Sequence, residues 1–384
     1  MSTAGPAPAG GADARPRFTF LVHPLSEVTL RVFAARGLKW DILRSRPGRT
    51  LEFMYDAELI SKVTRFPRII SDLGTECTGE IIGIPTLPRF MLEDQGRAVD
   101  LMAHAAHELG ADADLVGLGA LCAIVGSRGQ ELAERLAQPV TTGNSLTCWA
   151  ASETTQILYE TLSKTPRFAR RIVVVGFPGT MANAIVEVLA RRGLPVEVYA
   201  RRLARRQAAW LDAVRENTGA PIPVWDDLTE AVRGKGIVVG AGSIGGELDG
   251  ADLRHGTVVV DVAQPLDTTP VQRRRTDLLV VEGEMVSLPV RSGDEWRSFW
   301  SGLYNLSVGQ VDRRVFACLA EPMVLCLNGR PESFSLGRTV TADQVEEIGR
   351  MARLHGFGVR DLFHGRTPLP PQTLTEFARV PWLP

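Results

Sequence analysis

A short glycine-containing segment follows a run of apolar residues in the middle of this 384-residue chain. Residues 172–175 are all β-branched and predict a strand. The small residues that follow have the spacing of a tight turn that leads into a helix. This order begins a dinucleotide-binding unit, in which backbone N–H groups and the helix N-terminus hold a pyrophosphate. The residues that we expect at this cofactor are Gly176, Gly179, Thr180, Met181 and Ala182.

Two arginines stand at the end of the next predicted strand, 196–199. An acidic residue there would bind the ribose 2′-hydroxyl of NAD, whereas Arg201 and Arg202 suit the 2′-phosphate of NADP. The alternative is that they share one solvated basic face with Arg205 and Arg206. The sequence predicts an NADP site and leaves the solvated face open.

Cys318 lies in an apolar segment that is predicted to be helical and is bent by Pro322. A cysteine in such a setting is usually a small core residue. The alternative is a catalytic thiolate, which needs a lowered pKa. His23 is a candidate activator for it, or else a structural histidine at the end of a strand.

Polar residues precede the predicted helix 146–163. Thr142, Asn144 and Ser145 either bind the reacting group and the cofactor or cap this helix, since hydroxyl and amide oxygens accept from its first N–H groups. Ala241 and Ser243 follow the predicted strand 237–240, at the edge where parallel sheets place their ligands. We therefore expect Ala241 and Ser243 near the nucleotide, and both roles stay open for Thr142, Asn144 and Ser145.

The alternation of apolar runs and amphipathic segments predicts an α/β protein. The N-terminal α/β substrate domain would be followed by a doubly wound Rossmann domain that binds NADP and by a C-terminal helical segment. The expected divisions are a disordered tail 1–16, the substrate domain 17–138, a connecting helix 139–165, the Rossmann domain 166–290 and the helical part with Cys318, 291–384.

Individual elements can be assigned from the same patterns. Predicted strands are 18–22, 51–55, 69–71, 80–84, 115–125, 172–175, 196–199, 222–225, 237–240, 257–261 and 278–281, with 222–225 at an edge because prolines flank its isoleucine. Predicted helices include 26–35, 98–109, 129–136, 146–163, 303–327 and 341–355.

Composition narrows the class of protein. The net charge is −1, with 45% hydrophobic and 23% charged residues, which is typical of a soluble protein and argues against a nucleic-acid partner. The five cysteines and six histidines show no metal-ligand spacing. We find neither a signal peptide nor an apolar stretch long enough for a membrane span, and we expect a cytoplasmic protein without a metal site.

Several short motifs follow one another along the chain: Thr141-Thr142-Gly143-Asn144, Phe316-Ala317-Cys318, Ala320-Glu321, Gly337-Arg338 and His355-Gly356-Phe357. Together with the glycine loop they resemble one enzyme family, the long-chain acyl-[acyl-carrier-protein] reductases. The likeness runs in order over residues 18–360.

The resemblance implies a reaction in two steps. Cys318 would take an acyl chain from acyl carrier protein as a thioester, and NADPH would reduce this thioester to the aldehyde. Asn144 and His23 would complete the catalytic set, and aldehyde release would bring peripheral contact with a membrane. Leu146 and Pro322 depart from the family pattern, so the acyl group is open between a long fatty chain and a polyketide or other specialised chain.

Two other hypotheses fit the residues. One is a shikimate-dehydrogenase-like NADP oxidoreductase that reduces a small carbonyl compound without covalent catalysis. The other is a non-catalytic NADP-binding sensor. The first predicts that Cys318→Ala keeps its activity, and the second predicts cofactor binding without turnover.

Overall fold

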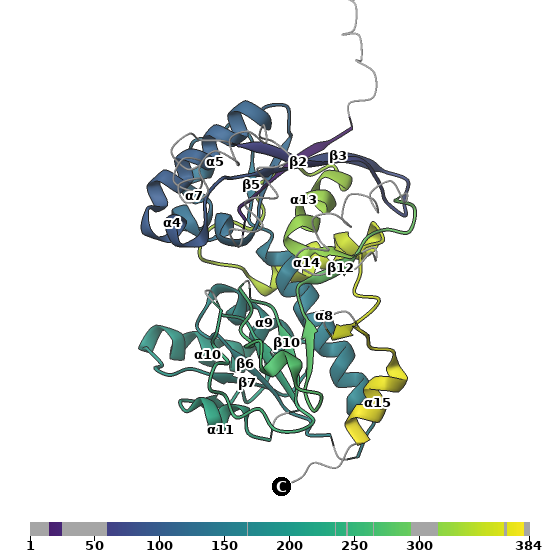
Figure 1. Cartoon of the computed structure of the whole chain (residues 1–384). Helices are drawn as coiled ribbons and strands as arrows, with labels where there is room; N and C mark the ends of the chain where they lie inside the picture. The colour runs from purple at the N-terminus through teal and green to yellow at the C-terminus, as the bar shows by residue number, and fades with distance from the viewer. Residues whose placement is uncertain are drawn as a thin grey trace, which may run out of the picture.

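The structure is a computed structural model of an α/β protein with two main sheets (Figure 1). It describes residues 15–24, 60–166, 168–234, 236–242, 245–263, 265–292, 314–364 and 367–379. The predicted tail up to residue 14, the helix 26–35, the strand 51–55 and the first part of the helix 303–327 lie outside these ranges.

The first sheet has five strands in the order β2-β3-β1-β4-β5. Neighbouring strands are parallel except for the antiparallel pair β2 and β3. Along β1, Phe18 and Phe20 point to one face of the sheet and Leu21 to the other, as expected for alternating side chains. The bounds are β1 (Arg17–Val22), β2 (Ser61–Ile70), β3 (Glu76–Gly83), β4 (Leu115–Leu118) and β5 (Val140–Thr141).

The predicted strand 115–125 is too long. β4 ends at Leu118, and left-handed backbone follows at Ala120 with a φ of 50°. Residues 126–129 have four consecutive positive φ values, which no strand accommodates. Short helical turns therefore replace the strand: η1 (Ala120–Ala123), α6 (Val125–Arg128) and α7 (Gln130–Ala133), packed near α4 (Pro88–Glu93) and α5 (Gln95–Leu109).

The second sheet has eight strands in the order β15-β14-β11-β10-β9-β6-β7-β8. Its six strands from β11 to β8 are parallel, and the chain reverses its direction of winding between β6 and β9. The two antiparallel C-terminal strands were not predicted. The bounds are β6 (Ile172–Val175), β7 (Val196–Tyr199), β8 (Val224–Trp225), β9 (Ile237–Gly240), β10 (Val258–Asp261), β11 (Leu279–Glu282), β14 (Phe363–His364) and β15 (Thr367–Pro368).

Both faces of this sheet are buried, which explains its continuous apolar strands. Ile172 and Val174 of β6 join the cluster under the helices α8 (Asn144–Leu162) and α9 (Thr180–Arg191), whereas Val173 and Val175 join a second cluster on the opposite face. The helices that follow these strands are α9 (Thr180–Arg191), α10 (Arg205–Thr218) and α11 (Leu228–Val232).

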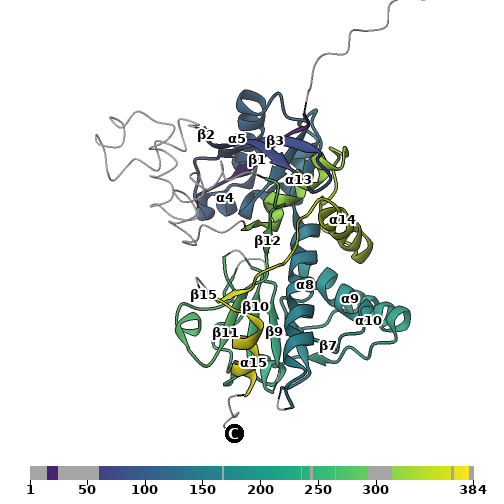
Figure 2. The same cartoon turned by 90° about the vertical axis from the view of Figure 1, so that its right-hand side faces the viewer.

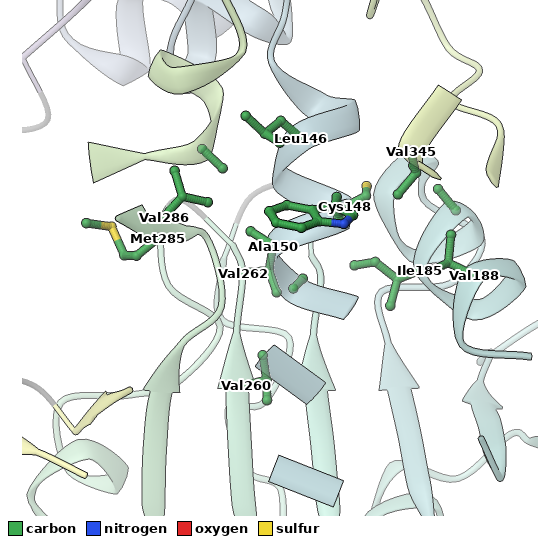
Figure 3. Packing of buried hydrophobic residues seen from close by; sticks show 14 of the residues in the cluster. Leu146, Cys148, Ala150, Ile185, Val188, Val260, Val262, Met285, Val286 and Val345 are labelled. Atoms are coloured by element: carbon green, nitrogen blue, oxygen red, sulfur yellow. The ribbon is translucent and has the colours of Figure 1, made fainter. Parts of the chain in front are cut away.

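A single long helix, α8 (Asn144–Leu162), contacts elements of both halves of the molecule (Figures 1 and 2). Figure 3 shows Leu146, Cys148 and Ala150 of α8 among residues of α9, β10 and β12 (Met285–Ser287). The C-terminal segments α13 (Ala317–Leu327), α14 (Ala342–Leu354) and α15 (Pro371–Arg379) also pack on α8. No helix in the described ranges is long and apolar enough to cross a membrane.

The helix that carries Cys318 lies on the first sheet. α13 packs against β1, β3 and β4, and a Cβ on Gly117 would lie 2.9 Å from Cγ of Pro322. Its N-terminus is fixed by β13 (Arg314–Phe316), which pairs with β12. The C-terminal part of the chain thus completes the core of the first sheet.

Candidate functional site

Two cavities open next to each other where these elements meet, and they share one wall residue, Arg128. The smaller is the cysteine pocket: Ala120, Ala123, Ile124, Arg128, Thr142, Asn144, Thr147, Met181, Gly242, Val262, Glu284, Phe316 and Cys318. The larger is the arginine pocket: Arg128, Phe177, Pro178, Gly179, Thr180, Asn183, Glu187, Arg206, Gln207, Trp210, Arg338, Thr339, Val340 and Thr341.

Cys318 is the second residue of α13 and is partly exposed in the cysteine pocket. Burial raises the pKa of its thiol to about 12, and the nearby carboxylates of Glu284 and Glu321 act in the same direction. The N–H groups of Leu319 and of Cys318 itself oppose this rise. With this pocket as it stands, the sulfur is a neutral thiol at neutral pH.

The backbone of Gly143 lies directly against Cys318. A Cβ at position 143 would be 2.3 Å from Cα and 2.6 Å from Cβ of Cys318, and the φ of Gly143 is +75°. Only glycine fits both the left-handed backbone and this contact. The first turn of α8 is therefore held beside the sulfur.

Glu321 fixes this arrangement from the buried side. Its carboxylate accepts hydrogen bonds from the hydroxyl of Thr141 (2.5 Å), the N–H of Leu146 (2.8 Å) and the N–H of Gly143. Burial raises the pKa of Glu321, and these donors counteract the rise. A negative charge at the N-terminus of the 19-residue helix α8 is also stabilised by the helix dipole.

Three polar side chains of the same segment line the cysteine pocket: Thr142, Asn144 and Thr147. The Thr147 hydroxyl donates to the carbonyl of Gly143 (2.9 Å). The Thr142 hydroxyl is buried, and within the described residues it has no hydrogen-bond partner. A buried hydroxyl of this kind is a candidate contact for a ligand.

His23 does not line either cavity. Its Nε2 accepts from the N–H of Leu121 (3.1 Å), and Nδ1 lies 2.9 Å from the carbonyl oxygen of Pro24. Burial lowers the pKa of His23 to about 4. Because both ring nitrogens are engaged, His23 holds the turn 120–123 that forms a pocket wall and does not reach Cys318.

Arg128 extends from a strained backbone segment. Ser127 and Arg128 have φ values of 54° and 59°, a region that side chains other than glycine rarely adopt. The carbonyl of Arg128 accepts from the N–H of Gly337 (3.0 Å), and the Ser127 hydroxyl donates to Glu131 (2.8 Å). These contacts hold the arginine between the two cavities.

The arginine pocket gathers positive charge at the N-terminus of α9. Burial and the neighbouring Arg338 lower the pKa of Arg128. In the described part of the chain, neither of these two nor Arg206 forms an ion pair with a carboxylate. The Thr180 hydroxyl donates to the carbonyl of Arg338 (3.1 Å), which ties the helix to the loop. Such an array suits a phosphate group.

The predicted cofactor residues separate into three groups. Gly179 and Thr180 line the arginine pocket, and Met181 and Thr142 line the cysteine pocket. The others lie elsewhere: Gly176 packs on the backbone of Ala241, Ala182 is in the core, Arg201 and Arg202 are exposed outside both cavities, and Ser243 lies outside the described residues.

Sequence reasoning missed Arg128 and Glu284, assigned Arg206 only to a solvated face, and used Arg338 only as part of the motif Gly337-Arg338. The glycines on either side of Ser127 and Arg128 were a usable signal of left-handed backbone, because glycines often flank such turns. Glu284 carries no local signal, and the motif Gly337-Arg338 does not indicate a place in a cavity. Both residues reach the cavities only through contacts between segments that are far apart in the sequence.

Most of this chain is similar to a curated protein. It is 31% identical over 355 residues to aminotransferase PigE of Serratia sp. (strain ATCC 39006), which is 90% of this chain and 40% of the relative. The chain thus spans less than half the length of that protein. No family model matches it.

Solved structures give only distant likenesses. Ornithine carbamoyltransferase from Gloeobacter violaceus is 12% identical, with a TM-score of 0.34 over 69% of this chain and 79% of that one. The enzyme from Campylobacter jejuni is also 12% identical, with a TM-score of 0.31 over 64% and 74%. At these scores the likenesses carry no argument about fold or chemistry.

These findings contradict the predicted identity and reaction. The relative is an aminotransferase, so the resemblance to acyl-ACP reductases is wrong, and with it the NADPH-dependent oxidoreductase, its alternatives and the NADPH cofactor. The structure shows why the motifs misled: Glu321 caps α8, and a Cβ on Gly356 would lie 2.3 Å from the Asp72 carboxylate. Such residues maintain packing and do not identify a reaction. The arginines chosen for the NADP phosphate lie outside both cavities.

Proposed function

We propose that this chain binds a phosphorylated carbonyl compound across the two cavities, with the phosphate in the arginine pocket and the carbonyl carbon at Cys318. The observation that carries the proposal is the position of Arg128, which lines both cavities. One ligand that passes this residue would meet the arginines at one end and the thiol at the other. Such a site is concave and has a few convergent polar groups, as small-molecule sites do.

The residues of the cysteine pocket support reversible covalent binding. When the Cys318 thiol adds to a carbonyl carbon, a C–S bond forms and the C=O π bond breaks. The thiol proton ends on the former carbonyl oxygen, so no oxidant or reductant is needed. Thr142 and Asn144 offer hydrogen-bond donors to that oxygen.

The relative's name raises the question of pyridoxal phosphate, which aminotransferases bind through a lysine Schiff base. The described residues do not fit this cofactor: Lys62 pairs with Glu80 (3.0 Å) on the first sheet, and Lys164 is exposed after the end of α8. Neither lines a cavity. We therefore derive no transamination step for this chain.

The test is protection of Cys318 from alkylation by iodoacetamide, mapped on peptides by mass spectrometry. The ligands are aldehyde phosphates of increasing chain length, starting from glycolaldehyde phosphate, each beside its unphosphorylated aldehyde. We expect the aldehyde phosphate that protects best to do so at a concentration at least about tenfold lower than its unphosphorylated aldehyde requires. A tenfold difference in affinity corresponds to about one charge-assisted hydrogen bond. Arg128→Ala and Arg338→Ala should remove this advantage.

Arg202→Ala is the matched control, because Arg202 is exposed and lies outside both cavities. It should keep the advantage. If no phosphate in the series protects better than its own unphosphorylated aldehyde, or if Cys318 is not alkylated at all, the proposed function is wrong.

A further inference from the structure

The arginine pocket has an aromatic wall. Phe177 and Trp210 both line it, with their ring centroids 5.8 Å apart and their planes at 37° to each other. Phe177 is 6% exposed and belongs to the core, whereas Trp210 is half-buried and packs against that core. Trp210 therefore offers an open aromatic surface to the cavity, and Phe177 supports it.

The helix α10 places Trp210 and a positive charge on the same side. Arg206 and Trp210 are four residues apart, which is about one helical turn, so their side chains leave the helix from one face. Leu211 and Val214 are buried and fix α10 on the core, where it contacts α9 (Figure 2). A flat apolar surface thus lies next to a guanidinium group that can pair with a phosphate.

We propose that the arginine pocket also holds a planar aromatic ring, which stacks on Trp210. The proposal rests on the proposed function for the phosphate, and it adds a further chemical group to the ligand. Trp210 lines only the arginine pocket, so the ring would lie in the cavity that Cys318 does not line. The ligand class becomes a phosphate ester that carries both an aromatic ring and a carbonyl group.

One polar atom of this cavity favours a ring that can donate a hydrogen bond. Oδ1 of Asn183 is buried, and within the described residues it has no hydrogen-bond partner. Other acceptors in the wall are engaged: Glu187 pairs with Arg191 (2.5 Å), and Oε1 of Gln207 accepts from the N–H of Ala204 (2.7 Å). A heteroaromatic ring with an N–H or amino group can donate to Asn183, whereas an alkyl group would leave this oxygen unsatisfied.

A ring on Trp210 also gains more than a saturated group of the same size. Aromatic pairs attract each other beyond the burial of their area, because the face of one ring is negative and the edge of the other is positive. A planar ring is rigid, so it loses little conformational freedom when it binds. These two effects predict a preference of about fivefold in affinity for a planar ring over a saturated one.

Calorimetric titration of the full chain at pH 8 with phenyl phosphate and with cyclohexyl phosphate tests the proposal. Both probes carry the same dianionic phosphate on a ring of equal size, but only the phenyl ring is planar. We expect phenyl phosphate to bind about fivefold more tightly. Equal affinities, tighter binding of cyclohexyl phosphate, or no binding of either probe would overturn the proposal.

Substitutions of Trp210 locate the ring. Trp210→Leu should remove the preference for phenyl phosphate, whereas Trp210→Phe keeps a flat ring and should retain most of it. Inorganic phosphate should bind equally to both variants, which reports that the arginines are still in place. A full preference in Trp210→Leu would contradict the proposal.

Arg205→Ala is the matched control on the same helix, because Arg205 is exposed and lies outside both cavities. It should keep the preference of the wild type. If phenyl phosphate is preferred while aldehyde phosphates leave Cys318 unprotected, only the proposed function fails. If aldehyde phosphates protect Cys318 while the two probes bind equally, only the aromatic subsite fails.

Discussion

At the scale of single residues, the sequence indicated Cys318 and Asn144 but not the groups that control them. Both carry side chains with recognisable chemistry, and both line the cysteine pocket. Glu284 and Glu321 also carry chemistry, yet their roles depend on which donors and charges surround them. One carboxylate faces a cavity and the other accepts from the α8 N-terminus, a difference that no local pattern encodes.

Gly143→Ala should destabilise the chain strongly. The new Cβ would lie 2.3 Å from Cα of Cys318, and φ is +75°. Backbone strain and overpacking together predict a loss of about 2–4 kcal/mol in the free energy of unfolding, measured by urea titration.

Gly193→Ala separates the two causes. Gly193 has a similar φ of +72°, but a Cβ there meets nothing within 4 Å. The free energy of unfolding of Gly193→Ala should fall by only about 1 kcal/mol, which is the cost of placing alanine in a left-handed backbone conformation. Equal losses in the two variants would mean that the contact with Cys318 is not tight.

At the scale of elements, the loops after β9 and β10 are joined by two buried carboxylates. Asp267 accepts from the N–H of Gly242 (2.7 Å), a residue of the cysteine pocket. Asp261, at the end of β10, accepts from the N–H of Asp267 (3.0 Å) and from the hydroxyl of Thr268 (2.6 Å). The shape of the pocket thus depends on a pair of like charges.

This pair makes stability depend on pH. Burial and the neighbouring charges of Asp261 and Glu247 raise the pKa of Asp267 from 3.8 to about 6. Because the folded value is the higher one, the stabilising contribution is complete below pH 3.8 and is lost as the pH rises through about 6. Relative to Asp267→Asn, the wild type should lose on the order of 3 kcal/mol over this range.

Urea titrations of both proteins between pH 4 and 7 give the comparison. The quantity of interest is the difference between their free energies of unfolding, which removes the titration of all other groups from the result. A difference that does not change with pH would show that Asp267 ionises in the folded chain as easily as in water.

Local patterns predicted most elements well where one periodicity dominates. The strands β6, β7 and β9 have the expected bounds, since a short apolar run between turn residues is compatible with few structures other than a buried strand. The prediction failed after Leu118, where left-handed residues interrupt an apolar run, and at the C-terminal strands β14 and β15, which are two residues each. Such short strands exist only because a sheet edge is available.

At the scale of the whole molecule, α8 is the element on which both sheets depend. Its first turn lies against Cys318, and its later turns pack on α9, α14 and α15. The sequence predicted this helix as a connector between domains. Its hydrophobic residues point in several directions because neighbours surround it, and a single-sided pattern was therefore absent.

Gly349→Ala should disturb this centre. A Cβ on Gly349 of α14 would lie 2.1 Å from Cδ1 of Trp149, a fully buried side chain of α8. Overpacking should destabilise the folded chain by about 1–3 kcal/mol. This loss should exceed the stabilisation of roughly 1 kcal/mol that alanine brings to a helix in place of glycine. Thermal unfolding followed by tryptophan fluorescence measures the net effect as a lower midpoint.

Gly358→Ala is the control for this substitution. A Cβ there would have Cγ of Arg360, 4.0 Å away, as its nearest contact, and the φ of Gly358 is not in the left-handed region. Its midpoint should stay close to that of the wild type. A midpoint for Gly349→Ala that is equally unchanged would mean that α14 can move away from α8.

Arg128 belongs to two cavities but carries a single positive charge. Two separate anions, one in each cavity, would have to compete for it, so the binding of one should weaken the binding of the other. A single molecule that occupies both cavities escapes this competition. If the proposed function is right, the shared arginine would therefore favour one ligand that spans both cavities over two separate anionic fragments.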